Sequence, residues 1–188
     1  MKTNQLIIAI MMIVLGLGTT VQAGERYVSS KSHIKFFSTT PAEDIEANNY
    51  ASSSTINTSN GSVVFSVPMQ GFEFPKALMQ RHFNQKDFLD TSTYPTSRLV
   101  AKITNLDQVD FTKDGTYDAV VEGELTIRGV TQQIREQGKV TVKGDKIEVK
   151  SVFNVALADH GIEFRRGKPA SNIAKEVEVT VYAEYLHE

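Results

Sequence analysis

The sequence predicts an all-β protein in which about seven or eight antiparallel strands form one barrel or sandwich, accompanied by one short helix. Apolar and polar residues alternate with a period of two in most segments, and turn signals containing glycine separate these segments. One stretch alone has helical spacing. Because closure of a sheet removes its exposed edges, we favour an antiparallel β-barrel of about eight strands over an open sandwich.

The clearest alternation lies in the segment 117–134. Every second residue in its first half is apolar or small, whereas the intervening residues, ending at Arg128, are mostly polar, which predicts a half-buried strand. Gly129 can adopt a positive φ and an extended run follows it, so the strand is predicted to fold back as a hairpin. The small residues Ala119 and Gly123 on the inner face are expected to leave volume in the space that they face.

Alternation and turn residues predict the remaining strands. Pro41 is expected to end the first strand, and Asn60-Gly61 is a hairpin turn signal. The polar segment 45–56 is predicted to form a twisted edge strand and a turn, and the long connection 158–175 resembles loops that act as lids or binding loops. The segments predicted to be strands are 27–38, 62–67, 99–103, 117–127, 130–142, 147–157 and 177–185.

Helical spacing replaces the alternation in the segment 76–84, which predicts a short amphipathic helix. Pro75 suits the first turn of this helix and Asn84 is a suitable last residue. The helix either caps an open end of the barrel or buries its apolar stripe against the sheet. The stripe consists of Leu78, Met79, His82 and Phe83.

The N-terminal residues have the pattern of a secretory signal peptide. Lys2 is followed by the apolar run 6–15, and small residues end at Ala23, which predicts a signal peptide over residues 1–23 and a single domain over residues 24–188. A membrane anchor is the alternative, but the apolar run is shorter than the roughly 20 residues that span a bilayer. We therefore expect an exported protein without a stable membrane anchor after cleavage.

Composition excludes several classes of site and partner. The chain contains no cysteine, which excludes disulfides, thiolate metal sites and the lipid-attached form of bacterial signal peptide. Its 20 Lys and Arg residues and 22 Asp and Glu residues give a formal net charge of −2, and no basic block is long enough to follow a phosphate backbone. Nucleic acid is therefore not an expected partner.

Four motifs that follow one another over nearly the whole mature chain resemble the successive motifs of the YceI-like family. The run G-x-L-T-I-x-G-V-T together with an upstream F-L-D-x-x-x-Y-P is more specific than either half alone. The motifs are Leu78–Phe83, Asp87–Asp90 with Tyr94-Pro95, Gly123–Thr131, and Leu157–Ile162.

This resemblance implies a lipocalin-like, extended eight-stranded antiparallel barrel that is exported to the periplasm. It also implies an apolar central cavity that holds a long isoprenoid chain, such as that of a polyprenyl phosphate or a quinone. The segment 41–60 is shorter and more polar than the corresponding part of the family pattern. We therefore expect a compact version of the family, with a shorter barrel or a narrower cavity.

The candidate ligand-binding residues are those predicted to face the barrel interior or its mouth. A packed core is the alternative, because an eight-stranded barrel is only just wide enough for its own side chains. Arg165, in the cationic run 165–168, is either a contact for a phosphate headgroup or part of a solvated loop. The candidates are Phe36, Phe65, Phe72, Phe74, Leu78, Met79, Phe83, Leu99, Val121, Leu125, Ile127, Phe153, Ile162 and Arg165, with Phe88 and Val179 beside them.

No catalytic residue, metal ligand or cofactor site is predicted. His82 and His160, the latter next to Asp159 and near Glu163, are the candidates for acid–base or metal chemistry, but no H-E-x-x-H motif is present and no serine lies in a G-x-S-x-G or S-x-x-K context. The first hypothesis is a binding protein that sequesters or carries an apolar, isoprenoid-like lipid. The alternative is a structural or stress-related exported module with a filled core, and a homodimer is one assembly that the sequence leaves open.

Overall fold

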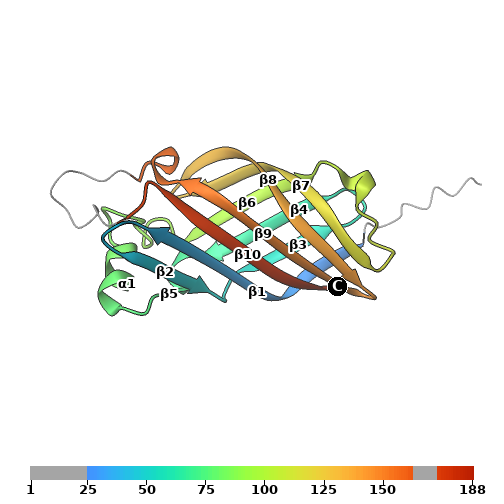
Figure 1. Cartoon of the computed structure of the whole chain (residues 1–188), viewed down its shortest axis with the longest axis horizontal. Helices are drawn as coiled ribbons and strands as arrows, with labels where there is room; N and C mark the ends of the chain where they lie inside the picture. The colour runs from blue at the N-terminus through green and yellow to red at the C-terminus, as the bar shows by residue number, and fades with distance from the viewer. Residues whose placement is uncertain (1–24, 163–172) are drawn as a thin grey trace, which may run out of the picture.

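Eight strand positions close into an antiparallel β-barrel in the computed structural model, which describes residues 25–162 and 173–188 (Figure 1). The described strands are joined in the order β10-β9-β8-β7-β6-β4-β3-β1-β2-β5, and β10 also pairs with β1. The closed ring and its short helix confirm the predicted fold class. The elements are β1 (Arg26–Thr39), β2 (Asp44–Asn49), β3 (Ser53–Asn57), β4 (Ser62–Pro68), β5 (Phe72–Glu73), α1 (Ala77–Asn84), β6 (Thr96–Ile103), β7 (Gly115–Ile127), β8 (Val130–Lys143), β9 (Lys146–Ala156) and β10 (Glu176–His187), with 3₁₀ turns at Met69–Gly71, Leu106–Gln108 and Leu157–His160.

The polar segment 45–56 forms two short strands rather than one edge strand and a turn. β2 pairs with the second half of β1, starting at Ile34 opposite Asn49, and β3 pairs with its first residues, where Arg26 lies opposite Asn57. As many residues separate Arg26 from Ile34 on β1 as separate Asn49 from Asn57 on the β2–β3 side, so β2 and β3 keep one register against β1. Together they fill a single strand position, and the ring is complete despite the short, polar segment.

The helix begins later than predicted. Lys76 keeps an extended backbone with φ −113° and ψ 119°, so α1 starts at Ala77 and Pro75 lies before the helix rather than in its first turn. Asn84 is its last residue, as predicted. Figure 1 shows α1 at one end of the barrel and the C-terminus at the opposite end.

The hairpin between β7 and β8 is confirmed, with one correction to its turn. Arg128 and Gly129 form a two-residue loop, and both have positive φ, 51° and 75°. The strand therefore ends at Ile127, and Arg128 lies in the turn rather than on the outer face of the strand. Two successive positive φ values are typical of the type I′ turn that matches the twist of paired strands.

Gly123 has a different role from the one predicted. A Cβ atom at this position would lie 2.3 Å from the carbonyl oxygen of Val100 and 2.5 Å from the Cβ of Ala101. Its missing side chain therefore allows close contact between β6 and β7 instead of leaving space in the interior. Ala119, by contrast, does line the cavity described below.

The barrel is packed most densely at the end that holds the β8–β9 turn. Tyr185 is fully buried there, and its hydroxyl accepts a hydrogen bond from Ser54 Oγ at 2.8 Å. With Tyr185, the largest fully buried apolar side chains of the described residues are Ile56, Val142 and Ile147. This end therefore forms a solid plug, which confines any open space to the part of the barrel nearer α1.

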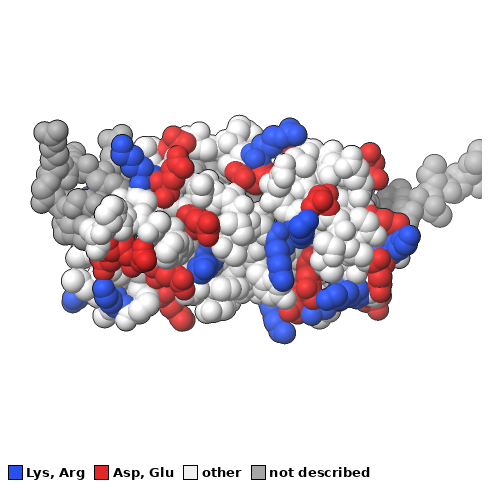
Figure 2. Space-filling view, in the orientation of Figure 1, with Lys and Arg blue, Asp and Glu red and all other residues white. Residues whose placement is uncertain are grey.

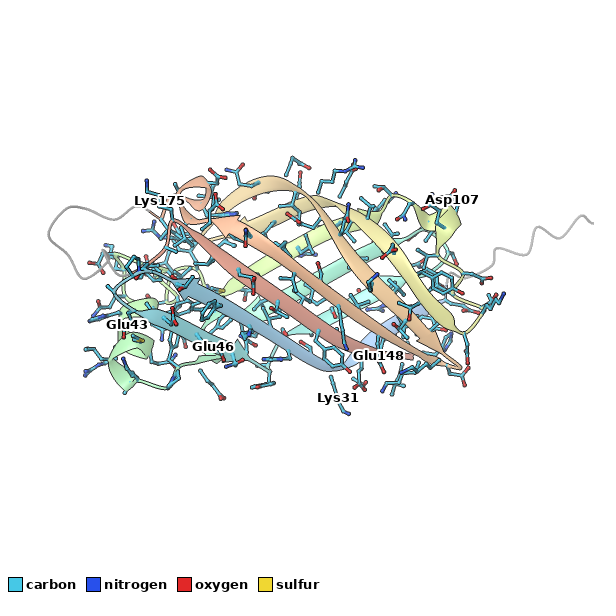
Figure 3. All side chains as sticks on the ribbon, in the orientation of Figure 1. Lys31, Glu43, Glu46, Asp107, Glu148 and Lys175 are labelled. Carbon is cyan, nitrogen blue, oxygen red and sulfur yellow. The ribbon has the colours of Figure 1, made fainter. Side chains whose placement is uncertain are left out.

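An ionic network on the outer face joins the strands that close the ring. The Glu184 carboxylate on β10 lies 2.6 Å from Lys146 Nζ on β9 and 3.6 Å from Lys31 Nζ on β1, and it also accepts a hydrogen bond from the Tyr182 hydroxyl. Lys31 and Glu148 flank this part of the seam in Figure 3. Hydrogen bonds from Lys146 and Tyr182 lower the pKa of Glu184 to about 2.

We predict that Gly123→Ala destabilises the barrel, because its Cβ would overlap backbone atoms of β6. Forcing a methyl group into such a contact is expected to lower the free energy of unfolding by about 2–3 kcal/mol, measured by urea denaturation. Gly144→Ala is the control, because a Cβ there meets nothing within 4 Å and the strain comes from its positive φ alone. An equal loss in both variants would contradict the close-contact explanation.

We also predict that Glu184 contributes to stability in a pH-dependent way. Its pKa in the folded protein is about 2, below the ordinary value of 4.5, so the stabilisation is fully present above pH 4.5 and is lost as the pH falls towards 2. Wild type is therefore expected to have the higher Tm at neutral pH, and the difference from Glu184→Gln is expected to narrow on acidification. A difference that stays constant in thermal denaturation would contradict this assignment.

Candidate ligand cavity

The barrel encloses a cavity of about 1300 Å³ between the plugged end and α1. This volume exceeds the roughly 300–1,000 Å³ of most small-molecule sites. Its wall is made largely of aliphatic and aromatic side chains from the inner face of the ring, and the remaining polar groups gather mostly near α1. The interior is therefore not filled by side chains, contrary to the packed-core alternative.

The predicted candidates converge on this cavity. All of them that fall within the described residues line it, from Phe36 on β1 to Phe153 on β9, as does Ile162 after the 3₁₀ turn that follows β9. Arg165 lies outside the described residues. Those lining the cavity are Phe36, Phe65, Phe72, Phe74, Leu78, Met79, Phe83, Leu99, Val121, Leu125, Ile127, Phe153 and Ile162, together with Phe88 and Val179.

A cluster of phenylalanines holds α1 across the end of the barrel. The Phe83 ring on α1 lies 5.7 Å from that of Phe36 on β1, 5.1 Å from that of Phe74 and 6.0 Å from that of Phe88. Aromatic pairs at such distances add to the stabilisation that burial provides. Leu78 on the same helix remains 54% exposed and also lines the cavity, so α1 covers part of the mouth and borders an opening.

Arg128 is a second connection at this end, and sequence reasoning placed it wrongly. Its guanidinium donates hydrogen bonds to the carbonyl oxygens of Gly161 at 2.6 Å and Lys86 at 3.3 Å, and the side chain lines the cavity. The β7–β8 turn is thereby tied to the segment after α1 and to the segment after β9. The position of Arg128 directly before Gly129 is the sequence signal that would have placed it in the hairpin turn.

Glu136 is a charged cavity residue that the sequence prediction did not include. It follows Ile134 by two residues on β8, so a continuation of the same alternation places it on the inner face. Three serines in the wall have hydrogen-bond partners: Ser38 accepts from the Ala174 amide, Ser97 donates to Met69 Sδ, and Ser151 donates to the Gln137 carbonyl. Among the described residues Glu136 has no hydrogen-bond or ion-pair partner, and desolvation raises the pKa of its carboxyl.

The two candidate histidines lie in different surroundings. His160 is buried, and its Nδ1 lies 3.1 Å from the Val130 carbonyl oxygen. His82 lines the cavity near its mouth, and no group of three or more potential metal ligands is found in the described part of the chain. Glu163 lies outside that part.

The outer surface carries both acidic and basic side chains. Figure 2 shows Lys and Arg residues interspersed with Asp and Glu residues on the face in view. None of the described helices is long and apolar enough to cross a membrane. The feature that distinguishes the molecule is therefore its interior: a closed antiparallel barrel around a large apolar cavity.

Such a barrel is lipocalin-like in form, with eight antiparallel strand positions closed around an internal cavity, and the sequence shows which family it belongs to. The model of the YceI-like domain matches residues 26–185, so the chain is a member of the YceI-like family, as its motifs predicted. No curated protein matches the sequence significantly.

Solved structures share the fold at low sequence identity. A polyisoprenoid-binding domain from Saccharophagus degradans, implicated in plant cell wall breakdown, superposes with a TM-score of 0.74 at 16% identity, covering 86% of this chain and 98% of that domain. BcnA from Burkholderia cenocepacia gives a TM-score of 0.66 at 18% identity, with 81% and 95% covered. The YceI protein of Campylobacter jejuni gives 0.54 at 14% identity, with 71% and 77% covered.

We predict that Arg128→Asn weakens the helix end of the barrel. Asparagine tolerates the left-handed backbone but cannot reach the two carbonyl oxygens, so a loss of about 1–3 kcal/mol is expected in urea denaturation. Arg135→Asn is the control, because its surface ion pair with Glu122 is expected to contribute less than about 1 kcal/mol. Equal losses in the two variants would show that the hydrogen bonds of Arg128 do not connect these segments.

Proposed function

We propose that the protein is an exported carrier that holds a long apolar, isoprenoid-like lipid, such as a polyprenyl phosphate or a quinone, inside the barrel. The observation that supports this most directly is the cavity of about 1300 Å³ with its apolar wall. Each methylene transferred from water into such a wall contributes roughly 0.8 kcal/mol, so a long chain gains affinity with each unit it buries. The role requires no catalytic group.

Two further observations support this function. The superposed domain from Saccharophagus degradans is a polyisoprenoid-binding domain, and almost its whole length is covered. The N-terminal pattern of Lys2, an apolar run and small residues up to Ala23 supports export to the periplasm, with residues 1–23 removed.

The alternative, an exported module that acts through its surface, has less support. It requires a filled interior and an exposed apolar patch. The interior is open, and the large apolar side chains that are most exposed come from five separate segments of the chain. They are Tyr50, Leu78, Val100, Val152 and Leu186.

We predict that Leu125→Trp reduces binding of an added polyprenol at least about tenfold, because the larger side chain projects from β7 into the barrel cavity and takes up space that the lipid needs. Leu125 lies opposite Leu99 in the wall. Val100→Trp is the matched control, because Val100 is 44% exposed on the outer face of β6 and is expected to leave binding unchanged. Occupancy is measured by native mass spectrometry of the mature protein.

The same measurement tests the function itself. Wild-type protein that emerges empty after gentle purification, and takes up no added polyprenol, would contradict a carrier. Wild-type uptake that Leu125→Trp does not reduce would place the lipid outside the barrel.

A further inference from the structure

The wall of the barrel contains a window between β8 and β9. These strands are paired from Lys143–Lys146 at their turn to Gly138–Ser151, where the ladder ends. Beyond this pair β8 stays bonded to β7 as far as Val130, and β9 stays bonded to β10 as far as Ala156. β8 therefore lacks one neighbour over its first half and β9 over its second half, and Figure 1 shows β8 arching away from β9 there.

The window is bounded at both ends. At the near end Ser151 Oγ donates a hydrogen bond of 2.6 Å to the Gln137 carbonyl oxygen. At the far end the 3₁₀ turn after β9 bridges back to β8, since Gln132 Nε2 donates to the Asp159 carbonyl at 2.6 Å and His160 contacts Val130. The gap is therefore an opening within a closed wall.

This window connects the cavity with the outer surface. Inner and outer side chains alternate along β8, and Gln137 and Lys139 are exposed on its outer face. Both nevertheless border the cavity, together with Gly138 and Ser151 at the point where the ladder ends. Gln137 is the first residue of β8 beyond the last pair of the β8–β9 ladder, so its position on the cavity lining supports an opening at this point.

Glu136 lies beside this opening, and its carboxylate has no hydrogen-bond or ion-pair partner among the described residues. It faces the cavity next to Gln137, and Val121 is its cross-strand neighbour on β7. Partial burial among apolar groups disfavours the charged form, which raises the pKa of its carboxyl. An acceptor in such a place is stabilised by any donor that enters the window.

The basic side chains around the window are already engaged elsewhere. On β8, Arg135 pairs with Glu122, and Lys139 Nζ lies 2.7 Å from Asp118 Oδ1, both across the outer face to β7. On β9, Lys150 Nζ lies 5.4 Å from the centre of the Tyr182 ring. Among the described residues of the flanking strands no cation pairs with Glu136, so the complementary charge would come from a ligand.

We propose that this window is a polar subsite of the cavity, in which Glu136 receives a hydrogen-bond-donating group, an ammonium or a hydroxyl, carried by an aliphatic chain that lies in the barrel. This inference rests on the proposed carrier function and adds a specificity-determining residue to it. It replaces the phosphate and quinone named there by a donor group, because neither an ionised phosphate nor a quinone can donate a hydrogen bond to Glu136. An ammonium gains both a charge-assisted hydrogen bond and charge neutralisation, whereas a phosphate would bring like charges together. The subsite therefore favours amines first, then alcohols, over phosphates.

The test compares three ligands that share one chain: geranylgeranylamine, geranylgeraniol and geranylgeranyl phosphate. Binding to the mature protein is measured at about pH 8, where carboxylates are ionised and amines remain charged. We expect wild type to bind the amine at least about tenfold more tightly than the phosphate, with the alcohol between them. Glu136→Gln is expected to weaken amine binding, to strengthen phosphate binding, and to change alcohol binding least.

Glu124→Gln is the control for charge alone. Glu124 lies on the outer face of β7, where it accepts a hydrogen bond from Gln133 Nε2, so its replacement changes the net charge equally without touching the cavity. Equal changes in Glu124→Gln and Glu136→Gln would attribute the preference to net charge and overturn the subsite.

A second measurement locates the polar end of the ligand. Because the chain contains no cysteine, Gln137→Cys gives a single site for an environment-sensitive fluorophore at the window. Addition of the amine is expected to shift its emission, whereas the same label at Val100→Cys on the outer face should not respond. A response at neither position, with the amine bound, would place the polar end elsewhere and overturn the subsite.

The outcomes separate this inference from the carrier function. Failure of all three ligands to bind wild type would contradict the carrier. Equal binding of the three, unaltered by Glu136→Gln, would leave the carrier intact and remove the subsite.

Discussion

The structure depends on the pairing of its first and last strands. β1 and β10 are hydrogen-bonded from Tyr27–His187 to Phe37–Glu178, and this single ladder converts a sheet into a ring. Once the ring is closed, every inner side chain faces the same enclosed space, and its apolar surface can be covered only by other side chains or by a ligand. The ionic network of Glu184 lies on the outside of this seam, where it adds to closure without entering the interior.

The interior of the ring is filled at one end and open at the other. Near the β8–β9 turn, Tyr185 and Ile147 fill the ring and their burial is complete or nearly so. Towards α1 the strands stay long, since β1 and β8 have 14 residues each and extend roughly 45 Å, but the inner side chains only line the wall. Phe83 and its aromatic neighbours close this end only in part, which is why a plug and a mouth lie at opposite ends of one barrel.

Periodicity predicts this architecture because alternation reports directly which face of a strand is buried. It placed Phe36, Leu99 and Leu125 in the wall and located the β7–β8 hairpin, but it did not distinguish a cavity from a filled core. Both arrangements turn the same residues inward, so alternation alone does not separate them. It also misread Gly123, because a missing side chain on an inner face is equally compatible with empty space and with close contact to β6. The signal peptide and Arg165 remain predictions, since residues 1–24 and 163–172 lie outside the described part.

The window between β8 and β9 shows that strand pairing carries information that the alternation of side chains does not. Ending the β8–β9 ladder at Gly138–Ser151 forgoes hydrogen bonds that contribute about 1 kcal/mol each, although solvent can satisfy the freed backbone groups. Two unpaired strand edges would invite association with other chains, but the edge of β8 carries Gln133, Arg135 and Gln137, polar or charged side chains of the kind that oppose such pairing. The same stretch turns Glu136 inward. Polar residues on both faces of this part of β8 suit an opening better than a sealed apolar wall. The polar composition of the segment and the end of its pairing with β9 therefore have one explanation.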